Sequence, residues 1–333
     1  MDRKKIVLLF VFMASIFMVA EMSGVPYFVE ETRQRGESQN TFEWFKDVKE
    51  DSLLTYIKTE AKKRRIEPVD AKVDSVWKAI PGYNGLEVDI QATYQKALEQ
   101  KTQGSIPFVY REIKPRVNLE DLGDHPIYRG NSEKKMASIM INVAWGNEFI
   151  IPILDTLDEE QVKATFFFDG SWLKKNIELA KEIQKRGHEL ENHAYSHPNM
   201  SQLSESRAYQ EIDKTKKLLE EQLGVHNKWF APPSGDYNDN TVRIAGQIGL
   251  KTVLWTVDTI DWKNPPPEQI VNKIRNKVTA GSLILMHPTS SSSAALKQMI
   301  VTIKAKGLQL GTVSETLSSS RTDVERDVNM KVK

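Results

Sequence analysis

The feature that most constrains the fold is an alternation of short apolar runs with longer amphipathic segments between about residues 136 and 316. The short runs have the length of strands, and the longer segments repeat their apolar residues at helical spacing. Strands that alternate with helices form βαβ units around one parallel sheet. About seven such units in about 180 residues favour a distorted (β/α) barrel, with an open doubly wound sheet as the alternative. The expected strands are residues 137–143, 164–168, 189–193, 229–230, 252–257, 282–286 and 308–312, and the expected helices are residues 149–157, 172–186, 207–223, 241–248, 268–278 and 294–306.

The N-terminus carries a basic segment followed by a strongly apolar one. Three basic residues at positions 3–5 precede residues 6–20, which are apolar apart from Ser15. This arrangement is typical of a secretory signal, and the absence of a clear small-residue cleavage site leaves an uncleaved signal anchor open. We therefore expect residues 1–29 to be a signal peptide or signal anchor. The protein is then exported to the cell wall or the extracellular space, and any membrane contact is confined to this segment.

Composition excludes several kinds of site. The chain contains no cysteine, so disulfides and thiolate metal sites are excluded, and a metal would need His, Asp, Glu or water as ligands. Its 46 basic and 45 acidic side chains give a formal net charge of +1. Because no basic stripe is interleaved with aromatic residues, nucleic acid is not an expected partner.

Changes in composition divide the rest of the chain. Residues 30–40 are polar and read as a linker, residues 41–130 as a small α+β domain or spacer, residues 131–317 as the barrel domain, and residues 318–333 as a polar tail. Within the small domain we expect a helix at residues 45–65 and strands at residues 72–80, 86–90 and 106–113. It contains no recognisable catalytic set of residues.

Two histidines, His193 and His197, follow one of the expected strands. Imidazoles four positions apart can bind one metal ion if the backbone between them turns. No glutamate follows His193, so the pattern is not that of a helical metalloprotease site. An isolated pair of histidines on a turn is more often solvated than metal-bound. The prediction of a metal site therefore depends on the motifs at other strand ends.

Three further motifs lie at the ends of expected strands. Residues 232–235 read Pro-Pro-Ser-Gly, a rigid turn that allows close approach and suits a pocket wall. Asp258, Asp261 and Trp262 leave another strand together, and carboxylates beside an aromatic ring suit sugar binding. An apolar strand ends at His287. Because the C-terminal ends of parallel strands meet on one face, these motifs are expected to form one site.

In this order, the His-x-x-x-His pair, the Pro-Pro-x-Gly turn, the Asp-Trp pair and the Leu-x-His strand resemble the polysaccharide deacetylase family. This is the NodB-homology domain of carbohydrate esterases. The overall sequence pattern is most similar to sporulation and cell-wall members of Bacillus type. The resemblance covers about residues 136–316. It implies an α/β fold with a distorted (β/α) barrel, a divalent metal and removal of acetyl groups from peptidoglycan, chitin or xylan.

The resemblance also implies a role for each matching residue. His193 and His197 match the metal-binding histidines, and zinc is the expected metal, although nickel or cobalt would also fit. His287 matches the general acid that protonates the leaving amine. Asp261 matches the carboxylate that orients this histidine, and Trp262 matches the aromatic side chain of the acetyl pocket.

The first and third motifs depart from the family pattern. Asn142 replaces the aspartate that acts as base, and an amide cannot accept a proton at neutral pH. The third metal ligand would have to come from Asn142, Asn147 or Glu148. Ala231 stands where the family has an arginine that pairs with the base. The two losses are physically linked, because a buried arginine without its carboxylate would be an unpaired charge.

These departures leave three functions open. The first is a metal-dependent deacetylase of N-acetylated cell-wall polysaccharide, with low or altered activity. The second is a non-catalytic glycan-binding pseudoenzyme, and the third is an exported structural protein with a vestigial site. For the first two, the expected substrate-binding residues are Trp145, Pro232, Pro233, Ser234, Gly235, Asp258 and Trp262.

Overall fold

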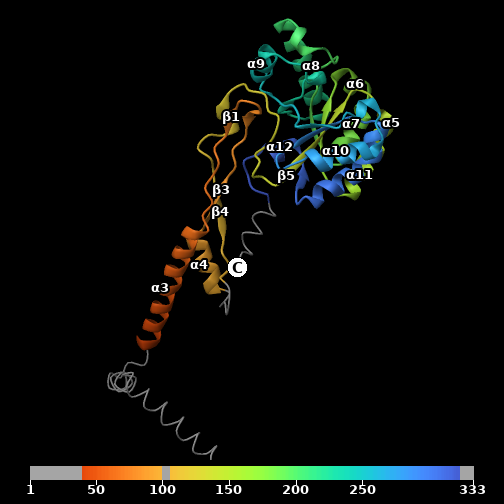
Figure 1. The fold of residues 1–333 in the computed structure, drawn as a ribbon. Helices are drawn as coiled ribbons and strands as arrows, with labels where there is room; N and C mark the ends of the chain where they lie inside the picture. Colours follow the sequence, from red (N-terminus) through yellow and green to blue (C-terminus); the bar gives the residue numbers. More distant parts are fainter. Residues whose placement is uncertain (1–39, 100–105, 323–333) are drawn as a thin grey trace, which may run out of the picture. The chain divides into compact units, whose positions relative to one another are not determined.

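The computed structural model describes residues 40–99 and 106–322, and within them the chain forms two compact units (Figure 1). The smaller unit contains α3 (Asn40–Lys63) and α4 (Ile90–Glu99), which contact each other. The expected helix at residues 45–65 is found as α3, whereas α4 was not expected. The larger unit holds residues 64–89 and the chain from residue 108 onward.

The targeting predictions fall outside the described residues. The expected signal or anchor (1–29), the linker up to residue 39 and the tail from residue 323 all lie there. Among the helices that the structure does describe, none has both the length and the apolar character required to cross a bilayer.

The larger unit is built on a parallel sheet with the strand order β10-β11-β5-β6-β7-β8-β9, in which β12 also pairs with β5. Helices surround this sheet (Figure 1), which confirms the predicted α/β fold of barrel type. The strands are β5 (Met136–Val143), β6 (Thr165–Phe168), β7 (Glu189–Asn192), β8 (Trp229–Phe230), β9 (Lys251–Thr252), β10 (Val257–Asp258), β11 (Leu283–Met286) and β12 (Gln309–Gly311). The helices are α5 (Asn147–Glu159), α6 (Gly170–Lys175), α7 (Ile177–Lys185), α8 (Glu205–Leu223), α9 (Asp239–Gln247), α10 (Pro267–Lys277), α11 (Ser290–Ala305) and α12 (Val313–Leu317).

Strand β5 explains how the barrel orients its first motif. All eight of its residues are buried, as expected for a central parallel strand covered on both faces. Ile139 and Ile141 pack into the cluster between the sheet and the helices, whereas Met140 packs into the barrel interior. Since side chains alternate along a strand, Asn142 shares the interior face with Met140 and lies near the C-terminal end of the strand.

Three predicted elements are divided in the structure. The expected helix at residues 172–186 breaks at Asn176, whose side-chain amide donates to the Trp172 carbonyl at 2.8 Å and ends α6. The expected strand at residues 72–80 is a hairpin of β1 (Lys72–Asp74) and β2 (Lys78–Ile80). Its turn forms because Asp74 accepts two backbone N–H groups, a contact typical of aspartate in turns.

The expected strand at residues 252–257 is divided into β9 and β10 because another segment lies alongside its middle. The N–H of Ile127 donates to the Thr252 carbonyl at 2.9 Å, and the N–H of Leu254 donates to the Ile127 carbonyl at 2.7 Å. Ile127 is fully buried in the barrel interior, and Arg129 pairs with Ser282 just before β11. Residues 127–129 thereby pair with the segments next to β9 and β11.

The larger unit therefore includes much of the segment expected as a separate domain at residues 41–130. Its hairpin β1–β2 pairs with Ile127, and β3 (Gly85–Val88) pairs with β4 (Tyr110–Ile113). Arg321, at the start of the expected tail, is buried against the Tyr83 ring and donates to the Asn84 carbonyl at 2.8 Å.

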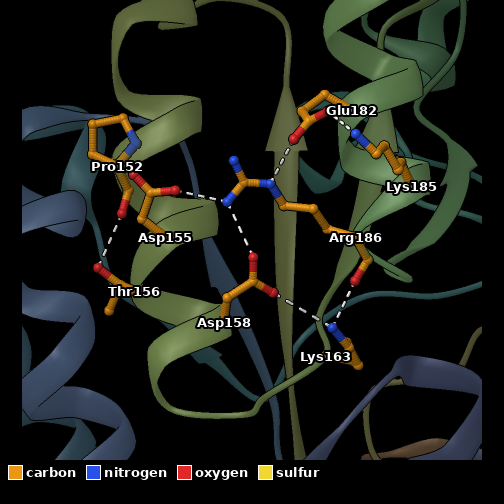
Figure 2. A network of polar contacts seen from close by, with 8 residues as sticks. All are labelled: Pro152, Asp155, Thr156, Asp158, Lys163, Glu182, Lys185 and Arg186. Carbon is orange, nitrogen blue, oxygen red and sulfur yellow. Dashed lines mark hydrogen bonds and ion pairs between the residues drawn. The ribbon is translucent and has the colours of Figure 1, made fainter.

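An ion-pair network joins α5 to the end of α7 (Figure 2). Arg186 donates to Asp155 at 2.7 Å, Glu182 at 2.8 Å and Asp158 at 3.1 Å. These hydrogen bonds, the one to Asp155 above all, raise the pKa of Arg186 above its ordinary value. Lys163 donates to the Arg186 carbonyl at 2.6 Å, so the network also fixes the loop that leads into β6.

Arg186→Ala is expected to lower the free energy of unfolding by about 1–2 kcal/mol. Three carboxylates share the Arg186 guanidinium, and such a network contributes more than a single exposed ion pair. Urea denaturation measures this change. Lys185→Ala is the matched control, since the Lys185 side chain is 81% exposed and its ion pair to Glu182 is long at 3.9 Å. Equal stability losses in the two variants would contradict the network's contribution.

Candidate functional site

A cavity of about 400 Å³ opens at the C-terminal ends of the barrel strands. Its lining residues are Asn142, Trp145, His197, Ser234, Trp255, Asp258, Trp262, Leu285 and His287. Trp255 and Leu285 were not among the predicted site residues, although Leu285 belongs to the Leu-x-His motif and Trp255 opens the Trp-Thr-Val-Asp segment. Pro232, Pro233 and Gly235 do not line the cavity, but Gly235 lies against the Trp255 ring, where a Cβ would be 3.0 Å from a ring carbon.

His193 lies directly after β7 and is 1% exposed. Its Nδ1 is 2.7 Å from the Ala231 carbonyl oxygen, so an N–H at Nδ1 donates there and Nε2 is left as an acceptor. Burial lowers the pKa of His193 to about 3, which keeps the ring neutral. The His197 ring lies edge-on to it, with a centroid distance of 5.2 Å. The structure therefore brings the two predicted metal-binding histidines together.

The loop between these histidines has an unusual backbone. Ala194 and His197 have φ values of 59° and 56°, in the left-handed region that most residues avoid. Glu211 on α8 stabilises the loop: its carboxylate accepts the N–H of Ser196 at 2.8 Å, the N–H of Tyr195 at 3.1 Å and the Ser196 hydroxyl at 2.9 Å. This role depends on a residue 15 positions away from the loop, which is why no local motif reveals it.

Glu211→Ala is expected to lower the free energy of unfolding by about 2–3 kcal/mol, because two loop N–H groups and a hydroxyl lose their acceptor. Glu211→Gln keeps one acceptor oxygen and is expected to lose about half as much. Chemical denaturation of both variants tests this. Stability unchanged by Glu211→Ala would show that the carboxylate does not hold the loop.

Asn142, which the sequence resemblance matches to the family's base, lines the cavity and brings no charge to it. It is 2% exposed, and its Oδ1 has no hydrogen-bond partner among the described residues. The other two candidate ligands do not line the cavity. Asn147 accepts from Trp172 Nε1 and donates to Asn176 Oδ1, both at 2.7 Å, so its amide joins α5 to α6. Glu148 is exposed in the first turn of α5.

The residues present do not complete the metal centre that the family implies. Within residues 40–99 and 106–322, no group of three or more His, Cys, Asp or Glu side chains could hold a metal ion. Catalytic zinc sites usually have three protein ligands. Asp169, at the end of β6, lies near His197, but it caps α6 by accepting from the Trp172 N–H at 2.8 Å. Metal binding by His193 and His197 stays a prediction.

His287 and Asp261 form a buried, doubly hydrogen-bonded pair at the site. Asp261 is fully buried; its Oδ1 is 2.8 Å from His287 Nδ1, and its Oδ2 accepts the His287 N–H at 2.6 Å. An N–H at Nδ1 therefore points to the carboxylate, and Nε2 remains for a ligand. Ile260 just before Asp261 has a φ of 58°, a strained value for a β-branched residue, and donates to Asp258 Oδ1 at 2.7 Å.

Trp145 covers one face of the His287 ring. The two rings are stacked, with a centroid distance of 5.3 Å and an interplanar angle of 14°. The next residue, Gly146, makes this possible: a Cβ there would be 1.9 Å from the Pro288 carbonyl oxygen, and its φ is 80°. Trp145 and Trp262 are both about half exposed, at 45% and 51%, so two tryptophan rings stand at the cavity with accessible surface.

The α/β fold and the resemblance to polysaccharide deacetylases agree with comparisons to known proteins. The family model described as polysaccharide deacetylase matches residues 129–253. A peptidoglycan-N-acetylglucosamine deacetylase of Bacillus cereus is 34% identical over 177 residues, which is 50% of this chain and 80% of that protein. The chain belongs to the polysaccharide deacetylase family.

Two similar proteins cover more of the chain. The uncharacterized protein YlxY of Bacillus subtilis is 42% identical over 318 residues, 96% of this chain and 98% of that protein. The crystal structure of BA3943 from Bacillus anthracis, a CE4 family pseudoenzyme, has 42% identity and a TM-score of 0.75 over 81% of this chain and 96% of that one. A mutant of that pseudoenzyme, 41% identical with the same TM-score, has restored enzymatic activity. It covers 81% of this chain and 99% of that one.

Proposed function

We propose that the barrel domain binds N-acetylated cell-wall glycan and releases little or no acetate. The observation that carries this proposal is that the cavity is lined by the neutral side chain of Asn142. The resemblance assigns this amide to the position of the family's base, and an amide cannot take a proton from water. The similarity to a CE4 pseudoenzyme over most of the chain supports the same function.

The cavity retains what glycan binding needs. Trp145 and Trp262 offer accessible ring faces on which the C–H surface of a pyranose ring can stack, and Asp258 can accept sugar hydroxyl groups. His287 Nε2 can exchange a hydrogen bond with the acetamido group, while Asp261 fixes the orientation of the ring. None of these contacts requires an ionised base.

The second candidate is a slow deacetylase, and the intact pair of His287 and Asp261 favours it. A histidine held in this way can protonate a leaving amine. Without a general base to activate water, the rate would be lower by about 10²–10⁴-fold. Acetate release that depends on His287 would select this candidate.

Isothermal titration of the full chain with an N-acetylated chitooligosaccharide tests glycan binding. We expect binding that Trp262→Ala weakens by about 10-fold, since loss of a stacked ring costs about 1–2 kcal/mol. Tyr209→Ala is the matched control, because Tyr209 is a similarly exposed aromatic residue on α8 outside the cavity. An equal effect of the two changes, or no binding at all, would contradict the proposed function.

We also propose that residues 1–29 export the protein, because cell-wall glycan lies outside the cytoplasmic membrane. The basic and apolar pattern of this segment supports the proposal. Cell fractionation is expected to find the full chain with the wall or the membrane and a chain without residues 1–29 in the cytoplasm. Retention of the full chain in the cytoplasm would contradict it.

A further inference from the structure

We propose that Asn142 makes this cavity selective for acetylated over deacetylated amino sugars, so that the protein recognises the acetylation state of the glycan. The inference rests on the proposed function and goes beyond it, because glycan binding alone does not require this selectivity. It would make the domain a sensor of unmodified glycan in a wall where other members of the family remove acetyl groups.

The hydrogen bonding of Asn142 favours an acetamido group. Its side chain lines the cavity, is 2% exposed and leaves Oδ1 without a partner among the described residues. A buried polar group without a partner is unfavourable, and a ligand that supplies one is bound more tightly. The amide of Asn142 offers both a donor and an acceptor, so it can pair with either the C=O or the N–H of an acetamido group.

The charges around the cavity disfavour a free amine. A glucosamine unit carries an ammonium group, and moving a charge out of water without a counter-charge is costly. With aspartate at position 142, that charge would find a partner on β5; with asparagine it finds none there. The walls beside it include the apolar groups of Trp255, Trp262 and Leu285.

The other charged groups of the site do not supply a counter-charge for the ammonium group at this position. Asp258 lines the cavity, but it lies on β10, which β11 separates from β5, and its Oδ1 already accepts the Ile260 N–H. Asp261 is fully buried, and both of its oxygens are bound to His287. The histidines at the cavity, His197 and His287, can only add positive charge.

The test compares the affinities of the full chain for fully N-acetylated chitotetraose and for the glucosamine tetramer. Titrations are run at neutral pH with a chelator present, so that neither turnover nor metal binding contributes. We expect the unaltered chain to prefer the acetylated tetramer by about 10-fold or more, as expected for a buried hydrogen bond combined with an unpaired charge. Asn142→Asp should reduce this preference to about 3-fold or less, because its carboxylate pairs with the ammonium group.

Two further variants complete the test. Asn272→Asp makes the same chemical change on α10, outside the cavity, and should leave the preference unaltered. Asn142→Ala adds no charge, so it remains informative if Asn142→Asp does not fold, and it should weaken binding of the acetylated tetramer alone. Equal affinity of the unaltered chain for the two tetramers would overturn the inference while leaving glycan binding intact. Binding of neither would overturn the proposed function itself.

Discussion

Combining Asn142→Asp with Ala231→Arg is expected to raise acetate release from N-acetylated glycan by at least about 10²-fold over the unaltered chain, the size of a general-base contribution. The new carboxylate would lie at the C-terminal end of β5, inside the same cavity as His287. The restored activity of a mutant of the Bacillus anthracis pseudoenzyme shows that a related site can regain its chemistry.

The two changes are expected to depend on each other. Ala231 is fully buried, so Ala231→Arg alone places an unpaired charge in the barrel and should lower the free energy of unfolding by about 3–5 kcal/mol. In the double variant the carboxylate supplies a partner, and part of this loss should return. Acetate assays and denaturation of both single variants and the double variant measure the coupling. A folded double variant that releases no more acetate than the unaltered chain would contradict the assignment of Asn142.

Removal of the Asp261 carboxylate is expected to destabilise the protein strongly. Asp261→Ala should lower the free energy of unfolding by about 3–4 kcal/mol, since two buried N–H groups of His287 lose their acceptors and a cavity remains. It also frees the His287 ring to turn, so glycan affinity should fall.

Asp261→Asn is the matched variant, because its carbonyl oxygen can still accept one of the two N–H groups. We expect it to lose about 1–2 kcal/mol. Urea denaturation distinguishes the three forms. If Asp261→Ala is as stable as the unaltered chain, the pair between Asp261 and His287 contributes little and the account of the site is wrong.

The barrel could be predicted because its signals are local. Strand β5 is a continuous apolar run that is buried on both faces, and α8 shows clear helical spacing between a serine cap and a glycine end. The interruption between β9 and β10 could not be predicted in this way. It depends on Ile127, which lies more than a hundred residues earlier and pairs there through only a few backbone bonds.

The part of the site that could be predicted is the part built from motifs at the ends of strands. His287, Asp258 and Trp262 lie at one cavity, as the strand-end rule predicts. The role of Asn147 could not be predicted in this way. Its sequence position suggested a metal ligand, but its amide is hydrogen-bonded to Trp172 and Asn176. Such contacts join side chains 25 and 29 positions apart, and no local pattern in the sequence reports them.

Acetate release by the unaltered full chain, measured while it is saturated with N-acetylated peptidoglycan fragments, shows directly whether the barrel binds glycan without hydrolysing it. Bound glycan is measured in the same sample, and His287→Ala serves as the reference for background release. We expect bound glycan with no acetate above that reference, because Asn142 cannot act as a base. Sustained acetate release that is absent from His287→Ala would contradict it and identify the chain as a working deacetylase.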